Sequence, residues 1–283
     1  MPLSEKGFYG IGGRAEFFAE PESLQEVREM LAICHADKHP WRVMGGGTNL
    51  LIGDGLIPGY TLQLKGQAFS TIVQEGPRWI AGSAVQTTHL VKKAVEAGFG
   101  AASGLGGIPG TLGGAVAMNA GGHEAEVGDF VVEVRGFDAT GREKVWNHQE
   151  CGFAYRTSAF KNQCLITGVV LEFGSCDEGA LERHRLWVKN KIANQPYAQR
   201  SAGCMFKNPP GASAGRLIDL SGLKGRRVGD AMVSPLHANF IVNLGKATYE
   251  DVRALMDEIR GQVKLDHGVD LEPEVVIWES ARK

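Results

Sequence analysis

Two glycine-rich clusters are the segments of this chain best suited to chemistry. The first reads RVMGGGTNLLIGDG over residues 42–55, and the second reads AASGLGGIPGTLGGAVAMNAGG over residues 101–122. Glycine has no Cβ, so its backbone can adopt positive φ and let N–H groups approach a ligand closely. Successive N–H groups in such turns bind anions, and a helix N-terminus that follows adds its dipole. The two clusters therefore predict a phosphate-bearing cofactor that lies across both loops.

Neither cluster has the spacing of the common nucleotide-binding loops. A Rossmann unit needs G-x-G-x-x-G between a strand and a helix, and a P-loop needs G-x-x-x-x-G-K-S/T. Neither pattern fits residues 42–55 or 101–122. The spacing disfavours a nicotinamide-binding Rossmann domain and a P-loop, and it leaves two separate loops that share one dinucleotide.

The elements that must position these loops follow from hydrophobic periodicity. Helical spacing predicts a helix that begins with a capping box of Ser23 and Glu26, and a long helix after the Thr248 cap. Strands and helices without strict alternation predict an α+β fold, with a domain boundary after residue 194. The long helix has an apolar face of Val252, Leu255, Met256, Ile259 and Val263. The other expected elements are helices over residues 87–97 and 181–193, hairpins over 70–81 and 131–146, and strands over 42–44, 165–173, 240–243 and 271–278.

Composition limits the classes of partner and compartment. The chain has 43% hydrophobic and 22% charged residues and a net charge of −2, as expected of a soluble globular protein. This charge gives no electrostatic reason for binding nucleic acid or an anionic membrane surface. The five cysteines lack metal-site spacing, and no signal peptide or long apolar segment is visible. We therefore expect a cytoplasmic protein with reduced thiols, no bound metal, and no nucleic-acid or membrane partner.

Seven sequence blocks, in order along nearly the whole chain, carry a family resemblance. They read GGGTNLL (45–51), GGIPGTLGGAVAMNAG (106–121), FAYRTSAFK (153–161), SAGCMFKNP (201–209), AGRLIDLSGLKG (214–225), HANFIVN (237–243) and LEPEV (271–275). Together they resemble the UDP-N-acetylenolpyruvoylglucosamine reductase (MurB) family, in the smaller of its two types, which lacks an extra tyrosine-bearing loop. The resemblance implies an FAD domain of the vanillyl-alcohol-oxidase (PCMH) type over residues 1–194, in subdomains of about residues 1–65 and 66–194. A C-terminal α+β substrate domain over residues 195–283 would follow, and its last strand would carry Glu274.

The resemblance also implies a reaction. Tightly bound FAD would take a hydride from NADPH and reduce UDP-N-acetylglucosamine enolpyruvate to UDP-N-acetylmuramate. This step belongs to peptidoglycan precursor synthesis, and so to cell wall biogenesis, cell shape and cell division. Such a reduction needs a hydride carrier, a cation on the substrate carboxylate and a general acid beside the carbon that is protonated. We expect the enzyme to be a monomer.

Three residues match the catalytic positions of the family. Arg156 would grip the substrate carboxylate and stabilise negative charge as it develops. Cys204 stands where many relatives carry serine, and a thiol, with an ordinary pKa of about 8.5, would be protonated and able to donate the proton. Glu274, the second glutamate of LE-x-EV, would stabilise the enol. From the residues alone Glu272 is an equal candidate, because it lies two positions earlier on the same expected strand face.

Other residues fall at the cofactor and substrate positions that the resemblance implies. Tyr155, Lys207 and Asn208 would hold the sugar and diphosphate of the substrate. His237 is expected to be a neutral histidine at the core or its rim. The implied FAD contacts are Gly45, Gly46, Gly47, Thr48, Asn49, Leu50, Ser103, Gly104, Gly107, Ile108, Pro109, Gly110, Gly113, Gly114, Ala115 and Asn119.

Two other functions stay open at this point. An FAD oxidase of small alcohols or sugars would share the glycine clusters but would not need Cys204, Glu274 or the FKNP sequence. A non-catalytic protein that binds flavin or a nucleotide sugar would retain the two glycine clusters but would lack the general acid. The set of Arg156, Cys204 and Glu274 disfavours this second alternative.

Overall fold

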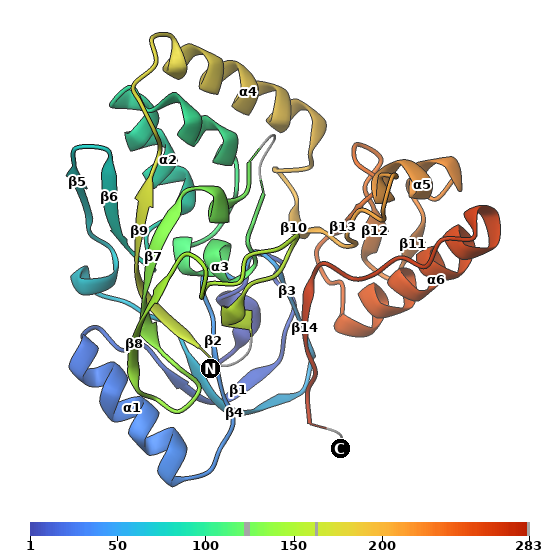
Figure 1. The fold of residues 1–283 in the computed structure, drawn as a ribbon. Coiled ribbons are helices and arrows are strands. Elements are labelled where there is room, and N and C mark those ends of the chain that lie inside the picture. Colours follow the sequence, from blue (N-terminus) through green and yellow to red (C-terminus); the bar gives the residue numbers. More distant parts are fainter. Residues whose placement is uncertain (122–124, 162–163, 282–283) are drawn as a thin grey trace. The chain divides into compact units, whose positions relative to one another are not determined.

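The computed structural model describes residues 1–121, 125–161 and 164–281 (Figure 1). Gly122, the last residue of the second glycine cluster, lies outside them. The α-helices are α1 (Leu24–Ala36), α2 (Thr87–Glu96), α3 (Leu112–Ala117), α4 (Ala180–Asn194), α5 (Ala214–Leu220) and α6 (Tyr249–His267). Short 3₁₀ helices are η1 (Leu3–Glu5), η2 (Gln67–Phe69), η3 (Gly100–Leu105), η4 (Val127–Asp129) and η5 (Ala159–Lys161).

The strands belong to four sheets, with the orders β1-β4-β2, β14-β3, β5-β6-β9-β7-β8 and β10-β13-β12-β11. Their bounds are β1 (Arg14–Ala19), β2 (Trp41–Val43), β3 (Leu50–Ile52), β4 (Leu56–Leu62), β5 (Ile72–Glu75), β6 (Arg78–Gly82), β7 (Val131–Phe137), β8 (Glu143–Asn147), β9 (Leu165–Glu172), β10 (Arg200–Cys204), β11 (Arg227–Val228), β12 (Ala231–Val233), β13 (Phe240–Asn243) and β14 (Val276–Trp278). The mixture of helices, hairpins and parallel pairs confirms the expected α+β class.

Contacts divide the chain into two compact units. The first unit contains Met1–Glu16, Gly47–Pro58 and Lys191–Lys283, and the second contains Phe17–Gly46 and Gly59–Asn190. The first glycine loop therefore passes from one unit to the other between Gly46 and Gly47. The domain boundaries expected after residues 65 and 194 stay predictions.

The second unit is built on the five-stranded sheet, and both predicted hairpins are confirmed as β5–β6 and β7–β8. β9 lies between β6 and β7, and residues from β6, β7, β9, α2 and α3 share one buried apolar core. The short helix α3, which lies within the second glycine cluster, contacts β6 and β9. The cluster is thus anchored beside β6 and β9, two inner strands of the sheet.

α1 also packs in the second unit, with Val27, Leu31 and Cys34 buried. The Ser23 hydroxyl accepts a hydrogen bond from the Glu26 N–H at 3.2 Å, as the predicted cap requires. The other half of the predicted capping box differs. The Glu26 carboxylate accepts from the N–H of Glu22 at 2.8 Å, one residue before the cap.

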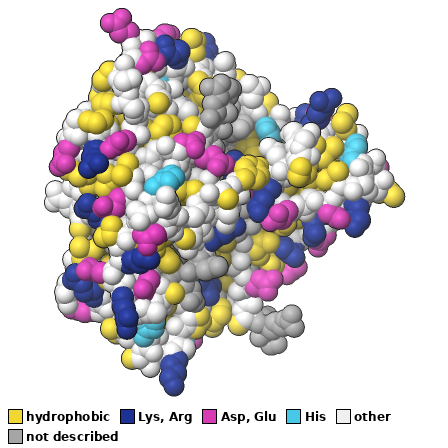
Figure 2. Space-filling model, viewed as in Figure 1, with side chains coloured by type: hydrophobic (Ala, Val, Ile, Leu, Met, Phe, Trp, Pro, Cys, Tyr) yellow, Lys and Arg dark blue, Asp and Glu magenta, His cyan; other side chains and the backbone are white. Residues whose placement is uncertain are grey.

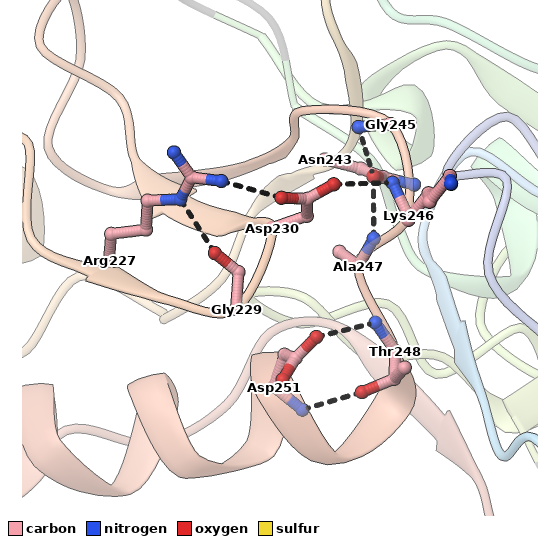
Figure 3. A network of polar contacts seen from close by, with 9 residues as sticks. All are labelled: Arg227, Gly229, Asp230, Asn243, Gly245, Lys246, Ala247, Thr248 and Asp251. Atoms are coloured by element: carbon pink, nitrogen blue, oxygen red, sulfur yellow. Dashed lines mark hydrogen bonds and ion pairs between the residues drawn. The ribbon is translucent and has the colours of Figure 1, made fainter.

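The first unit holds the four-stranded sheet, and α6 covers it with the predicted apolar face fully buried. The capping box of Thr248 and Asp251 begins the helix, with bonds of 2.9 and 3.1 Å (Figure 3). The Asn243 side-chain oxygen accepts from the N–H groups of Gly245 and Ala247, which fixes the turn from β13 into α6 (Figure 3). Local signals in the sequence therefore specify this helix and its entry.

The expected final strand over residues 271–278 is wrong over residues 271–275. Only β14 is a strand, and it pairs in parallel with β3. Residues 272–274 do not join the ladder of β14 and β3; Pro273, which has no N–H to donate, forms an isolated antiparallel bridge with Phe206. They instead lie along residues 205–207, where the N–H of Lys207 donates to the Glu272 carbonyl and the N–H of Glu274 donates to the Met205 carbonyl, both at 2.9 Å. Glu274 therefore lies outside the final strand, two residues before β14 begins.

Charge on the surface is mixed. On the face drawn in Figure 2, basic and acidic side chains are interspersed. In the part of the chain that the structure describes, no helix has both the length and the apolar character needed to cross a membrane.

Candidate active site

The two glycine clusters meet within the second unit. A Cβ on Gly46 would lie 2.9 Å from the Gly110 Cα, closer than real Cβ contacts, and a Cβ on Gly45 would overlap the Thr111 hydroxyl. Only glycine lets these two stretches of backbone approach so closely. The structure therefore brings together Gly45 and Gly46 of the first cluster with Gly110, Thr111 and Gly114 of the second.

This meeting point offers hydrogen-bond donors to a ligand. Among residues 1–121, 125–161 and 164–281, the N–H groups of Gly45, Gly46 and Gly110 donate to no protein acceptor. Clustered backbone N–H groups of this kind form a concave site for an anion. The site thus has the narrow glycine backbone and the donors that a dinucleotide diphosphate needs, and FAD fits this chemistry.

Gln63 supports the first glycine loop and was missed by the sequence reasoning. Its side-chain Nε2 donates to the Gly45 carbonyl at 2.8 Å, and the residue is 8% exposed. Its Oε1 is buried and has no hydrogen-bond partner among the described residues. The only available signal was a polar residue in an apolar stretch directly after β4, which does not reveal what the side chain contacts.

The second cluster is fixed by backbone bonds to the residues that follow β6. The N–H of Gly113 donates to the Ser83 carbonyl and that of Leu112 to the Val85 carbonyl, both at 2.8 Å. Gly107 and Gly110 have φ of +67° and +88°, the left-handed region that favours glycine. Ile108 and Ala115, two expected FAD contacts, have side chains in the buried core, so any contact with a cofactor would come from their backbone.

The remaining residues expected to contact FAD in this segment show local structural roles. The Ser103 hydroxyl donates to the Gly100 carbonyl at 2.6 Å. A Cβ on Gly104 would lie 2.9 Å from the Ala125 Cβ, so this glycine permits close packing. These roles leave the expected FAD contacts as predictions.

Asn119 is a buried hub of hydrogen bonds, 2% exposed and with φ of +43°. Its Oδ1 accepts from the N–H of Gly128 at 2.8 Å. Its Nδ2 donates to Glu126 Oε2 at 2.6 Å and to the Ala154 carbonyl at 3.0 Å. The side chain therefore serves the protein's own structure, and a role of Asn119 toward the cofactor stays a prediction.

Arg156 lies at the tip of a tight turn in the second unit. Ala154 and Thr157 exchange two backbone hydrogen bonds of 3.1 and 3.0 Å, and Arg156 between them has φ of +54°. Its side chain is 17% exposed, and its Nη1 lies 3.5 Å from Glu126 Oε1. The guanidinium carbon lies 5.1 Å from the centre of the Tyr155 ring, within cation–π range. The arginine is thus held in a defined, partly buried position.

The first unit brings Cys204 and Glu274 to the other end of the first glycine loop. Asn49 Nδ2 donates to the Glu274 carbonyl at 3.3 Å, and the N–H of Glu274 donates to the Met205 carbonyl at 2.9 Å, next to Cys204. A Cβ on Gly203 would lie 4.0 Å from the Thr48 carbonyl oxygen. Residues 48–49, 203–205 and 274, which are far apart in the sequence, are therefore neighbours. Leu50 extends this contact as part of β3.

Glu272 and Glu274 have different surroundings in the structure. Lys207 Nζ lies 2.5 Å from Glu272 Oε1, and the lysine side chain is 18% exposed. Glu272 is thus the counter-ion of an expected substrate-binding residue. Asn208, the next expected substrate contact, accepts a hydrogen bond from the Ala214 N–H at 3.0 Å through its Oδ1, which holds the start of α5.

Two titratable side chains near these segments have shifted pKa values. Burial and, to a smaller extent, the nearby Cys204 raise the pKa of Tyr197 to about 12. Burial lowers the pKa of His237, and the N–H of Asn239 donates to its Nδ1 at 3.3 Å. A half-buried neutral His237 agrees with its expected place at the rim of the core. In residues 1–121, 125–161 and 164–281, no cluster of His, Cys, Asp or Glu could hold a metal ion.

Comparison with known proteins gives the family. Residues 195–278 match the model of the UDP-N-acetylenolpyruvoylglucosamine reductase C-terminal domain, and residues 15–145 match that of an FAD binding domain. The reductase of Desulfosudis oleivorans is 40% identical over 290 residues, which covers 98% of this chain and 92% of that protein. UDP-N-acetylenolpyruvoylglucosamine reductase 2 of Symbiobacterium thermophilum is 38% identical over 279 residues, which covers 98% and 90%.

A solved structure agrees with these relatives. The crystal structure of the reductase (MurB) from Thermus caldophilus matches with a TM-score of 0.85 at 37% identity, covering 98% of this chain and 97% of that one. The fold is therefore an FAD-binding domain of the PCMH type followed by the C-terminal domain of these reductases. By sequence and by fold, this chain belongs to the UDP-N-acetylenolpyruvoylglucosamine reductase (MurB) family.

Proposed function

We propose that this protein is a flavoenzyme that uses NADPH to reduce UDP-N-acetylglucosamine enolpyruvate to UDP-N-acetylmuramate. The observation that carries the proposal is the neighbourhood of Cys204, Glu274 and the Thr48–Asn49 end of the glycine loop in one unit. Neither an FAD oxidase nor a passive nucleotide-binding protein needs an acid and a carboxylate at that place. Membership of a reductase family over nearly the whole chain supports the same reaction.

The glycine loops would hold FAD through their backbone. The donors of Gly45, Gly46 and Gly110 suit its diphosphate, and residues 47–50 would continue the contact. When bound, FAD supplies the hydride, which it takes from NADPH and passes to the terminal vinyl carbon of the substrate.

Three side chains would complete the reaction. The Arg156 guanidinium binds the substrate carboxylate and stabilises the charge that moves toward it as the hydride arrives. The Glu274 carboxyl shares a proton with the enol oxygen of the same carboxylate. The Cys204 thiol donates its proton to the carbon next to the one that received the hydride, which completes the saturated lactyl ether. Tyr155, Lys207 and Asn208 would bind the sugar and diphosphate.

We place the enzyme in the cytoplasm as a monomer that acts in peptidoglycan precursor synthesis, and so in cell wall biogenesis and cell division. In the part of the chain that the structure describes, no cysteine forms a disulfide, and reduced thiols are typical of the cytoplasm. The net charge of −2 and the interspersed charges in Figure 2 agree with a small-molecule substrate held by local contacts.

The proposal is tested by separating the two half-reactions in the absence of oxygen. The purified protein should be yellow, NADPH should bleach its flavin, and the enolpyruvyl substrate should restore the oxidised spectrum in a single phase. A flavin that NADPH reduces but that only oxygen reoxidises would contradict the proposal and favour an oxidase.

A further inference from the structure

We propose that Glu126 is a positioning residue that orients the Arg156 guanidinium toward the substrate carboxylate. This inference rests on the proposed function, because it concerns how Arg156 is aimed in that reaction. It assigns a role to a carboxylate that the sequence reasoning did not single out. All residues involved lie in the second unit.

The first step is the backbone of Arg156. A φ of +54° is unfavourable for a residue with a long side chain, and such a conformation persists only where the surroundings hold it. Here the two bonds between Ala154 and Thr157 close the turn, and Asn119 Nδ2 binds the Ala154 carbonyl at 3.0 Å. Neighbouring residues therefore hold the backbone of Arg156, and this sets the direction in which its side chain points.

The second step is the carboxylate of Glu126, which joins the same set of bonds. Its Oε1 lies 3.5 Å from Arg156 Nη1, and its Oε2 accepts from Asn119 Nδ2 at 2.6 Å. Its own N–H donates to Asp129 Oδ2 at 2.8 Å, which anchors the backbone. Arg156, Glu126, Asn119 and the Ala154 carbonyl thus form a closed circuit of polar contacts.

The third step is rigidity. The Asn119 amide is buried, and its oxygen is held by the Gly128 N–H at 2.8 Å, so its nitrogen must face Glu126 and Ala154. Because the Asn119 amide is held at its oxygen and its nitrogen, it cannot move with the Glu126 carboxylate. These bonds restrain the Glu126 carboxylate, and its Oε1 in turn restrains the position of Arg156 Nη1.

The fourth step is the fit around the guanidinium. A Cβ on Gly121 would lie 2.7 Å from Arg156 Nη1, so a side chain at that position would displace the guanidinium from where it lies. Gly121 thus leaves room for the guanidinium where Glu126 holds it. An arginine that only faced solvent would need neither the space at Gly121 nor the buried Asn119 amide that binds Glu126.

The test uses two ligands that differ in the carboxylate. UDP-N-acetylmuramate carries a lactyl carboxylate, and UDP-N-acetylglucosamine lacks it. In the flavin-loaded protein, Glu126→Gln should weaken binding of the first by about 10-fold or more and leave binding of the second unchanged, measured by titration calorimetry. It should also slow flavin reoxidation by the enolpyruvyl substrate by about 10- to 100-fold, with flavin reduction by NADPH unchanged.

Two variants sharpen the result. Glu143→Gln removes another carboxylate that pairs with an arginine, Arg28 at 2.7 Å on the surface, and should change none of these quantities. In an Arg156→Lys background, Glu126→Gln should cause little additional loss, because Glu126 acts through the guanidinium. Equal weakening of both ligands would show a general structural role and overturn the proposal, as would full reoxidation in Glu126→Gln.

The failure of the proposed function would look different. If the unmodified protein binds both ligands equally and the enolpyruvyl substrate does not reoxidise its flavin, the reductase assignment falls, and the role of Glu126 falls with it. If the unmodified protein prefers UDP-N-acetylmuramate and Glu126→Gln keeps that preference, only the role of Glu126 is refuted.

Discussion

Cys204 lies at the end of β10, beside the segment that carries Glu274. If its role is to donate one proton, then removing the thiol should affect only the step that consumes the proton. Cys204→Ala should leave flavin reduction by NADPH intact and slow flavin reoxidation by substrate by about 10²- to 10⁴-fold. Cys204→Ser should keep much of the activity, because a hydroxyl can hand over the same proton.

The control for Cys204 is Cys176→Ser, since Cys176 is exposed and Cys204 is half-buried. Stopped-flow absorbance of the flavin separates the two half-reactions. Unchanged turnover in Cys204→Ala would remove Cys204 from the mechanism, and complete loss in Cys204→Ser would indicate chemistry specific to the thiol.

His237 gives a prediction for the dependence of stability on pH. Burial lowers its pKa in the folded state, and its Nδ1 must be unprotonated to accept the Asn239 N–H. In the unfolded chain a histidine titrates near pH 6.5, about its ordinary pKa. The unfolded state therefore binds the proton first, so the stabilising contribution is complete above about pH 6.5 and is lost as the pH falls below it.

Urea unfolding at several pH values tests this prediction. The free energy of unfolding should fall less steeply between neutral and mildly acidic pH in His237→Gln than in the unmodified protein. The difference between the two proteins isolates this residue from the other groups that titrate. Parallel curves would show that His237 is not held neutral by the fold.

At the scale of elements, the contact between the two glycine clusters is the feature that FAD binding should need most. Gly46→Ala places a methyl group 2.9 Å from the Gly110 Cα, so the two loops must move apart. We expect FAD affinity to fall by at least about 10-fold and stability to fall by about 1–3 kcal/mol.

Gly261→Ala is the matched control for Gly46→Ala. Gly261 lies within α6, and a Cβ there would meet no atom within 4 Å. The same substitution should stabilise the protein by about 0.5–1 kcal/mol, because alanine is the better helix former, and should leave FAD affinity unchanged. Flavin release measured by fluorescence, with thermal unfolding, tests both variants; tight FAD binding by Gly46→Ala would contradict the proposed cradle.

Elements with strong local signals could be predicted from the sequence. α6 has a capping box and an apolar face in one stretch of chain, and β13 was expected over the residues that form it. The final strand could not be predicted fully, because residues 272–274 pair with the distant residues 205–207 and do not continue β14. Hydrophobic pattern gives no information on such long-range partners.

The sequence offers candidate residues for the site, which stay predictions, but gives no information on how they are arranged. The high glycine content of the two loops predicted that they contact a ligand. The sequence blocks that resemble the family pointed to Arg156, Cys204 and Glu274 as catalytic residues. The supporting side chains Gln63, Asn119 and Glu126 act through tertiary contacts, and their positions in the sequence carry no signal of those contacts. Both Asn49 and Asn119 hold backbone or side-chain groups of the protein, which only the structure could show.

At the scale of the whole molecule, the first unit is assembled from segments far apart in the sequence. β14 pairs with β3, and Asn49 binds the segment of Glu274, so the C-terminal region is completed by residues 47–58. Residues 195–283 alone would lack β3, the strand that pairs with β14. The first glycine loop therefore serves both units, which links the expected cofactor loop to the expected proton donor.

The most direct measurement of the central claim is NADPH consumption by the purified protein in air, with and without UDP-N-acetylglucosamine enolpyruvate. The account predicts a yellow protein that oxidises NADPH only when the enolpyruvyl substrate is present, with one UDP-N-acetylmuramate formed for each NADPH consumed. Oxidation of NADPH at the same rate without that substrate, or a colourless and inactive protein, would contradict it.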